Sequence, residues 1–174
     1  MRQGYHLGAP RGVRPARAAQ GLRSLVLTTH VEGEAREVGR LLAGFLREVA
    51  ASGHPLPRPC AVIAGGETTV AVRGTGRGGR NQEVALAGAF GLRGLQDVLL
   101  ASIGTDGSDG PTDAAGAWVD GTTVEQAAGR GLDPLAYLAE NDAYTFFDRL
   151  GGSNLVRTGP TNTNVNDLYL LFAF

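Results

Sequence analysis

The stretch D-V-L-L-A-S-I-G-T-D-G-S-D-G-P-T-D, residues 97–113, joins a short apolar run to a polar loop that is rich in glycine. A short apolar run bounded by turn residues is typical of a buried strand, which we expect over residues 97–103. The loop carries three carboxylates, on Asp106, Asp109 and Asp113. Open α/β sheets bind their ligands where strands end. This stretch therefore favours an α/β fold with a candidate site beside the strand.

Strands and helices are indicated on both sides of this stretch. Further strands are predicted at residues 24–29, 60–64, 68–73, 117–119 and 168–174. Helices are predicted at residues 34–50, 81–90, 122–130, 134–140 and 143–150. Only Gly65, Gly66 and Glu67 separate two of the strands, which favours a tight β-hairpin around residues 60–73. The expected fold is a Rossmann-like layered domain, with a mixed sheet flanked by helices.

The composition excludes several classes of partner and site. The formal net charge of the 174 residues is −1, so no attraction to nucleic acid or to a membrane surface is expected. All sixteen basic residues are arginines, which excludes a P-loop lysine and a Schiff-base lysine. Cys60 is alone, so no disulfide framework is expected. No apolar stretch approaches the roughly 20 residues of a membrane span, and we expect a cytoplasmic protein.

The chain divides into a leader and one domain. Residues 1–20 carry four arginines, no acidic residue and scattered Gly and Pro, which favours a disordered leader. Residues 21–174 contain no linker long enough to split them, so we expect a single domain there.

The loop G-T-G-R-G-G-R-N-Q-E, residues 74–83, leads into a predicted helix. Glycines, a helix N-terminus and the guanidinium groups of Arg77 and Arg80 together favour an anion site, and a solvated arginine-rich turn is the alternative. The spacing also matches the dinucleotide fingerprint G-x-G-x-x-G. That motif needs an acid after its second strand, whereas Asp97 precedes its strand, and the strand before the loop belongs to the expected hairpin. No dinucleotide site is therefore expected.

Two further polar loops can carry chemistry. The acids of residues 105–113 can hold Mg²⁺ together with substrate phosphates, or can accept a proton from an attacking hydroxyl. Alternatively, they form an Asx-rich turn and bond their own backbone. The loop T-G-P-T-N-T-N-V-N-D, residues 158–167, suits either a ligand or a loop that is bonded to itself.

Four separated motifs occur in a fixed order: G-G-E-T-T-V (65–70), G-R-G-G-R-N-Q-E (76–83), T-D-G-S-D-G-P-T-D-A-A-G (105–116) and T-G-P-T-N-T-N-V-N-D (158–167). Together they resemble the MOFRL region, the C-terminal part of class II glycerate kinases, some of which carry the label hydroxypyruvate reductase. The segment H-V-E-G-E-A-R-E (30–37) resembles the part just upstream. The resemblance runs from about residue 16 to the end of the chain.

The resemblance implies an ATP-dependent phosphorylation of D-glycerate at its 2-hydroxyl, with a divalent ion such as Mg²⁺, in a cleft between two α/β domains. Arg80 matches the arginine placed at the reacting phosphate, where its fork would offset developing charge. We expect Glu67 and Asn81 to orient the site, and Asp106 or Asp109 to meet the metal or the hydroxyl. The candidate catalytic residues are Arg80 and Asp106, the candidate metal ligand is Asp109, and the candidate substrate or phosphate contacts are Gly66, Glu67, Thr68, Arg77, Asn81, Gln82, Thr105 and Asn164.

The sequence departs from the family in one respect. The family also relies on a lysine in a larger N-terminal domain, and this chain has neither that domain nor a lysine. Phosphoryl transfer depends on positioning and electrostatics, so half a cleft is expected to be inactive. We expect a truncated glycerate 2-kinase, or one half of a kinase that needs a separate N-terminal kinase domain.

Two other interpretations stay open. One is a non-catalytic domain that binds a small molecule or is a remnant of the kinase, and the other is a true hydroxypyruvate reductase. A domain without its neighbour can expose apolar surface, so self-association into a homo-oligomer is a further option.

Overall fold

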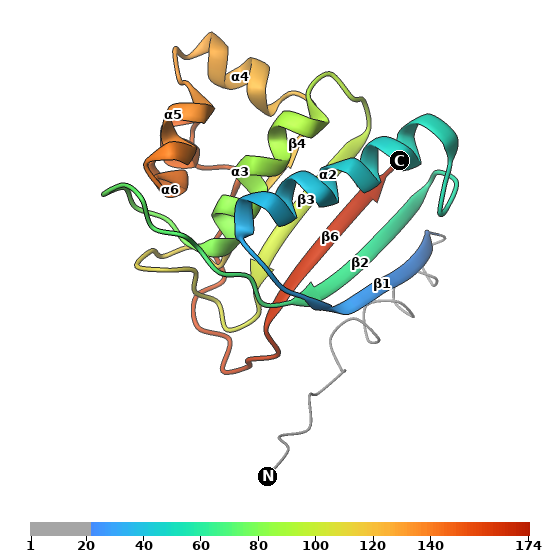
Figure 1. Ribbon diagram of the computed structural model, residues 1–174, viewed down its shortest axis with the longest axis horizontal. Coiled ribbons are helices and arrows are strands. Elements are labelled where there is room, and N and C mark those ends of the chain that lie inside the picture. The colour runs from blue at the N-terminus through green and yellow to red at the C-terminus, as the bar shows by residue number, and fades with distance from the viewer. Residues whose placement is uncertain (1–21) are drawn as a thin grey trace.

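A computed structural model describes residues 22–174 as an α/β fold built on one mixed six-stranded sheet (Figure 1). The strands are β1 (Arg23–Val31), β2 (Cys60–Gly66), β3 (Val98–Gly104), β4 (Gly116–Asp120), β5 (Leu155–Val156) and β6 (Asp167–Ala173). The helices are α2 (Ala35–Ser52), α3 (Arg80–Leu92), α4 (Thr123–Gly129), α5 (Pro134–Ala139) and α6 (Ala143–Arg149). The predicted α/β class is confirmed, and each predicted helix is present. The expected leader at residues 1–20 lies outside the described residues.

The sheet brings the ends of several strands together. Its strand order is β1-β2-β6-β3-β4-β5. β1 and β2 run parallel, whereas β6 lies between β2 and β3 and runs antiparallel to both. β4 is antiparallel to β3. Therefore β1, β2 and β3 finish at one end of the sheet, where β4 and β6 begin, and we call this the site end.

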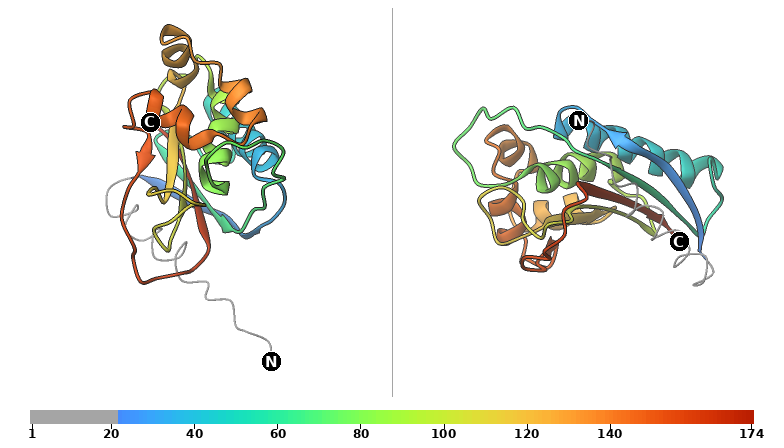
Figure 2. Two further views of the ribbon diagram at one scale, coloured as in Figure 1. Left: turned by 90° about the vertical axis from the view of Figure 1, so that its left-hand side faces the viewer. Right: turned by 90° about the horizontal axis from the view of Figure 1, so that it is seen from below.

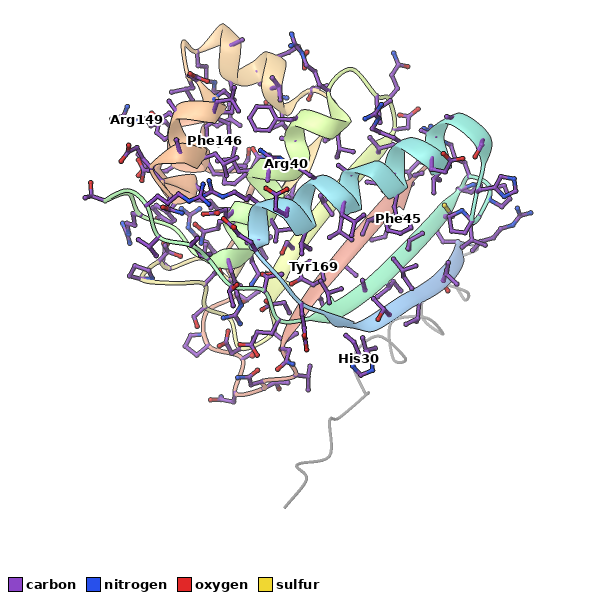
Figure 3. The ribbon with its side chains drawn as sticks, viewed as in Figure 1. His30, Arg40, Phe45, Phe146, Arg149 and Tyr169 are labelled. Atoms are coloured by element: carbon purple, nitrogen blue, oxygen red, sulfur yellow. The ribbon has the colours of Figure 1, made fainter. Side chains whose placement is uncertain are left out.

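Helices α2 and α3 pack on one face of the sheet, and α4, α5 and α6 gather beyond α3 (Figures 1 and 2). Helix α2 buries one apolar stripe, which includes Leu42, Leu46 and Val49, whereas α3 is buried along most of its length. Figure 3 shows Tyr169 of β6 beneath α2, where it is fully buried. Among residues 22–174, no helix combines the length and the apolar character that a membrane crossing needs.

The crossing of α2 and α3 depends on a glycine. A Cβ atom at Gly39 of α2 would overlap the carbonyl oxygen of Val84 of α3, and it would also approach the Cβ of Ala87 to 3.1 Å. Two helices can come this close only where one of them presents no side chain, as in small-residue helix contacts generally. Gly39 therefore sets how deeply α2 sits over the start of α3, the helix that carries most of the candidate site.

The predicted β-hairpin around residues 60–73 is wrong. Both neighbouring positions of β2 are already taken, by β1 on one side and by β6 on the other, so no place is left for a returning strand. The chain instead continues past the end of β1: the N–H of Glu67 donates to Val31 (2.9 Å), and Thr69 forms an isolated parallel bridge with Glu34. The spacing of the glycines indicated a turn, but long-range pairing with the two ends of the domain determined the path.

Candidate active site

Three polar segments meet at the site end of the sheet (Figure 1). The segments at residues 67–79 and 105–115 follow β2 and β3, and residues 157–166 lead into β6. Helix α3 begins at the same end, with Arg80 as its first residue. The loops at residues 105–113 and 158–167 adjoin β3 and β6, whereas the loop at residues 74–83 begins eight residues after β2, because residues 68–73 form no strand.

Arg80 is held by a buried carboxylate. Its Nε donates to Oδ2 of Asp167 (2.7 Å) and its Nη2 donates to Oδ1 (3.0 Å), a two-bond fork. The Asp167 side chain has no exposed surface, whereas 35% of the Arg80 side chain is exposed. The hydrogen bonds that Arg80 donates to Asp167 raise its pKa further, and the guanidinium stays charged. Two of its five N–H donors are therefore taken by Asp167, while the side chain as a whole stays partly exposed.

Glu67 forms a second ion pair with Arg80, on the side that is exposed to solvent. Its Oε1 lies 3.4 Å from Nη2 of Arg80, and 57% of its side chain is exposed. Gly66 and Thr68, on either side, are buried. A Cβ at Gly66 would overlap the backbone of Val31, so this glycine is required for the packing of β1 against β2. Of the G-G-E-T segment, only Glu67 is placed to meet a ligand.

Asn81 and Asp167 are joined beneath Arg80. Nδ2 of Asn81 donates to Oδ1 of Asp167 (3.0 Å), and Oδ1 of Asn81 accepts from the hydroxyl of Ser102 (2.6 Å). Asn81, Ser102 and Asp167 are all buried. The three residues come from α3, β3 and β6, so this network ties the helix start to the two central strands. Asn81 is thus placed to orient the Asp167–Arg80 pair, rather than to reach a ligand directly.

Asp109 caps the N-terminus of α3. Its Oδ1 accepts from the N–H of Asn81 (3.0 Å) and its Oδ2 from the N–H of Gln82 (2.8 Å). The N-cap residue itself, Gly79, has no side chain for this task. Burial raises the pKa of Asp109 to about 6, and the N–H bonds from Asn81 and Gln82 counter part of that rise. Both oxygens point at the helix, which fits a cap better than the predicted metal ligand.

Gln82 and Thr105 also serve the framework. Nε2 of the buried Gln82 donates to the hydroxyl of Thr112 (2.8 Å), which ties α3 to the acidic loop. The hydroxyl of Thr105 donates to the carbonyl of Asn166 (2.7 Å) and accepts from the N–H of Val165 (2.9 Å). These bonds fasten the loop after β3 to the loop before β6.

Asp106 and Asn164 form local turns. Oδ1 of Asp106 accepts from the N–H of Ser108 (2.9 Å), and Oδ1 of Asn164 accepts from the N–H of Asn166 (3.1 Å). Both are the Asx-turn pattern that the sequence left open as an alternative. Asp106 is partly exposed, so it stays a candidate for contact with a ligand.

The predicted metal role finds little support in the arrangement of donors. Among residues 22–174, no group of three or more His, Cys, Asp or Glu side chains is placed to hold an ion. Mg²⁺ in proteins often takes only one or two carboxylates and completes its shell with phosphates and water. Asp106 fits that description as a single ligand, whereas Asp109 does not.

Arg77 is placed differently from Arg80. Its guanidinium carbon lies 4.3 Å from the ring centre of Tyr144, and its Nε donates to the carbonyl of Pro111 (3.1 Å). The glycines before it pack on the turn between α5 and α6: a Cβ at Gly74 or Gly76 would overlap Glu140 or Asp142. The predicted anion site therefore consists mainly of Arg80, because Arg77 lies over Tyr144 and the Cβ sides of Gly74 and Gly76 face the α5–α6 turn.

Sequence reasoning missed three residues. Asp167 and Ser102 belong to the network beneath Arg80, and Asn141 donates to the buried Glu83 of α3. Asp167 ends the motif at residues 158–167 but was not selected as a site residue. It lies where a polar run meets an apolar strand, as does Gly104 at the end of β3. That boundary is a usable signal. Ser102 sits inside an apolar run, and Asn141 lies far from every motif, so only the fold brings them to the site.

Comparisons with known proteins agree with the motifs. The model of the MOFRL family matches residues 60–167. The chain is 50% identical over 151 residues to the D-glycerate 2-kinase of Thermotoga maritima, covering 87% of this chain and 36% of that protein. A crystal structure of glycerate kinase from the same organism superimposes with a TM-score of 0.92 at 45% identity, over 95% of this chain and 39% of that one. A putative hydroxypyruvate reductase of Agrobacterium vitis is 42% identical over 153 residues, covering 87% of this chain and 39% of that protein. The chain thus spans little more than a third of the length of these relatives.

Proposed function

Because this chain belongs to the MOFRL family, we propose that it supplies the C-terminal part of a glycerate 2-kinase. The reaction is the transfer of the γ-phosphate of ATP to the 2-hydroxyl of D-glycerate, in the cytoplasm. The proposal draws its substrates from glycerate kinase relatives that share 50% of the aligned residues. Within that reaction, this chain provides one wall of the cleft.

The observation that carries the proposal is the fork between Arg80 and Asp167. A buried carboxylate fixes the direction of the guanidinium, which is partly exposed at the site end of the sheet and keeps three further N–H donors. During phosphoryl transfer, negative charge spreads over the equatorial oxygens of the phosphoryl group, and a fixed guanidinium stabilises that charge without having to reorganise. Arg80 is therefore the group that we assign to the transferring phosphate.

The neighbouring side chains fill supporting roles. Glu67 limits the movement of Arg80 on its exposed side, and Asn81 orients Asp167 beneath it. Asp106 is assigned to the substrate hydroxyl or to a phosphate-bound Mg²⁺, which would supply positive charge at the phosphates. Asp109 and Gln82 hold the start of α3 in place, so we assign them to positioning rather than to contact with substrate.

A second wall of the cleft has to come from elsewhere. The chain contains no lysine, and its relatives are almost three times as long as the part that it matches. We propose that the isolated chain folds without turning over, and that it requires an N-terminal kinase domain, either fused or separate. Self-association of the chain stays a prediction.

Hydroxypyruvate reduction is not proposed, because the glycines that match a dinucleotide fingerprint are packed against the turn between α5 and α6. Gly74 and Gly76 pack against Glu140 and Asp142, and the N–H of Gly76 donates to the carbonyl of Glu140 (2.9 Å). A pyrophosphate needs those glycines to lie open to it. Asp97 also precedes β3, whereas the fingerprint needs its acid after the second strand.

The test is a coupled assay for ATP-dependent phosphorylation of D-glycerate. The chain is assayed alone, and also when it replaces the matching region of one of the glycerate kinases that it resembles. We expect no turnover alone, turnover in the chimera, and a loss of at least about a hundredfold in kcat for Arg80→Ala, the size typical of removing one charge-stabilising donor. The exposed Arg47→Ala variant serves as the control of equal charge, since Arg47 lies on the outer face of α2.

Each outcome decides between the alternatives. Turnover by the chain alone would overturn the half-site argument. A chimera that folds, as judged by its cooperative unfolding, but shows neither turnover nor ATP binding would favour a non-catalytic remnant. Equal activity of Arg80→Ala and Arg47→Ala would remove Arg80 from the reaction.

A further inference from the structure

We propose that Asn141, in the turn between α5 and α6, is a positioning residue that fixes the path of the glycine-rich segment at residues 70–79. That segment connects Glu67 to Arg80, the two charged groups on the exposed side of the site. No motif contains Asn141, and it lies 61 residues beyond Arg80 in the sequence. The part of the inference that concerns catalysis rests on the function proposed above.

Asn141 uses both ends of its side chain on the segment. Its Oδ1 accepts from the N–H of Arg73 (2.7 Å) and from the N–H of Gly74 (3.1 Å). Its Nδ2 donates to the carbonyl of Ala71 (3.3 Å). Asn141 itself has a φ of 54°, the left-handed conformation that Asn tolerates better than most residues. One buried amide thus replaces the partner strand that this extended segment lacks.

A buried ion pair holds the amide in place. Nδ2 of Asn141 also donates to Oε2 of Glu83 (2.9 Å), and Oε1 of Glu83 lies 2.8 Å from Nη2 of Arg36. Glu83 is 2% exposed and Arg36 is 7% exposed. Since Glu83 belongs to α3 and Arg36 to α2, the amide is tied to both helices. A charged group in this position leaves Asn141 a single favourable orientation.

Residues beside Asn141 at the α5–α6 turn form further hydrogen bonds with the segment at residues 70–79. The N–H of Gly76 donates to the carbonyl of Glu140 (2.9 Å), and the N–H of Arg77 donates to Oδ1 of Asp142 (2.7 Å). In return, the N–H of Tyr144 donates to the carbonyl of Arg77 (2.9 Å). Glu140, Asn141, Asp142 and Tyr144 therefore all bond to the segment, and the side chain of Asn141 also reaches the buried Glu83.

This arrangement explains the glycines of the segment without a ligand. Gly74 and Gly76 have no side chain because the backbone of the α5–α6 turn lies where a Cβ would be. The path of the segment then sets where α3 begins, and Arg80 is the first residue of that helix. Loss of Asn141 is expected to loosen the segment and to misplace Arg80 relative to the phosphate, while the core stays intact.

The first test is hydrogen exchange of the isolated chain with Asn141→Gly, which removes the side chain but keeps the left-handed backbone accessible. The matched control is Asp97→Gly, since Asp97 has a φ of 56° and lies at the opposite end of β3. We expect the amides of Arg73, Gly74 and Gly76 to exchange at least about tenfold faster in Asn141→Gly, with β3 and β6 unchanged. Unchanged exchange at these amides, or an equal change in Asp97→Gly, would overturn the proposal.

A rescue experiment separates positioning from general destabilisation. In Asn141→Asp, a carboxylate faces Glu83 and the donor is lost, so exchange at Gly74 is expected to rise. Adding Glu83→Gln restores an N–H donor between the two side chains, and the exchange at Gly74 is expected to return to within about threefold of the native rate. A double variant that exchanges as fast as Asn141→Asp would contradict the proposed bond.

The second test concerns catalysis and uses the chimera. We expect Asn141→Gly to lower kcat about tenfold while KM for D-glycerate changes less than about twofold, because the loosened segment affects the transferring phosphate more than the bound acid. If kcat were normal and exchange were fast, Asn141 would still fix the segment at residues 70–79, but it would have no role in catalysis. An inactive native chimera would count against the proposed function only, since the exchange experiment does not depend on turnover.

Discussion

Asp167 and Arg80 form a two-bond fork in which the carboxylate has no exposed surface and the guanidinium is partly open to solvent. The pair joins the first residue of β6 to the first residue of α3, which are far apart in the sequence. Because the acid is also bonded to Asn81, it cannot turn away when the arginine meets a ligand. The acid thus holds the arginine in a fixed direction, and this has consequences for stability that can be measured without any substrate.

Asp167→Asn keeps the shape of the side chain and removes its charge. We expect the free energy of unfolding to fall by about 1.5–3 kcal/mol, the usual contribution of hydrogen bonds to a charged group. Urea unfolding of the isolated chain measures it. Asp113→Asn is the control, since Asp113 forms an exposed pair with Arg157 and should cause a much smaller loss. Equal losses in the two variants would mean that the buried fork adds nothing to stability.

Asp109 makes the stability of the chain depend on pH. Burial raises its pKa to about 6, above the value near 3.8 expected in the unfolded chain. The folded state therefore binds this proton more tightly than the unfolded state. Its contribution to stability is fully present below about pH 4 and is lost as the pH rises through 6.

Carbon-detected NMR of the Asp109 carboxyl group is the direct measurement, with an expected midpoint near pH 6. Urea unfolding between pH 4 and pH 8 provides the second, because the stability difference between the native chain and Asp109→Asn should shift against the native chain as the pH rises. A midpoint below pH 4 would show that the N–H bonds from Asn81 and Gln82 outweigh burial.

Glu83 and Arg36 allow a comparison between a buried and an exposed ion pair that share one helix. Glu83→Gln leaves the buried Arg36 with only Glu34 as a charged partner, and we expect a loss of about 2–4 kcal/mol in the free energy of unfolding. Glu37→Gln removes a pair with Arg40 on the exposed side of α2, where we expect less than about 1 kcal/mol. Losses of similar size would indicate that Glu34 compensates fully for Glu83.

The elements of the fold were predictable because their signals are local. Apolar spacing located the helices, and the run at residues 97–103 identified a central strand. The hairpin failed because a strand pairs with whatever the whole chain brings beside it. Here Cys60 pairs with Arg23 and Ala173, which no short window of sequence can indicate.

The site was predictable where a residue stands in a motif, and less so where it acts through another residue. Arg80 and Glu67 were selected, and they lie together on the exposed side. Asp109 was selected for its charge, but its oxygens cap a helix, because a carboxylate near a helix N-terminus satisfies free N–H groups. Asn141 carries no charge and lies in a turn between two short helices, so its contacts appear only in the folded chain.

Gly39 and Gly44 lie in the same helix, and replacing each with alanine should change stability in opposite directions. A Cβ at Gly39 would overlap the carbonyl oxygen of Val84, so α2 would have to move away from α3. We expect Gly39→Ala to lower the free energy of unfolding by about 1–3 kcal/mol, as overpacking usually does. A Cβ at Gly44 meets nothing within 4 Å, so Gly44→Ala should gain about 0.5–1 kcal/mol through helix propensity.

Urea unfolding of both variants measures the difference, and the sign of each change is the decisive result. If Gly39→Ala were also stabilising, the two helices would have room to separate without cost, and the close crossing would not determine where α3 begins. A loss in Gly44→Ala would contradict the open space around that position, because alanine there meets no atom and lowers the entropy of the unfolded chain. Opposite signs would establish that the close crossing at Gly39 stabilises the packing of α2 on α3.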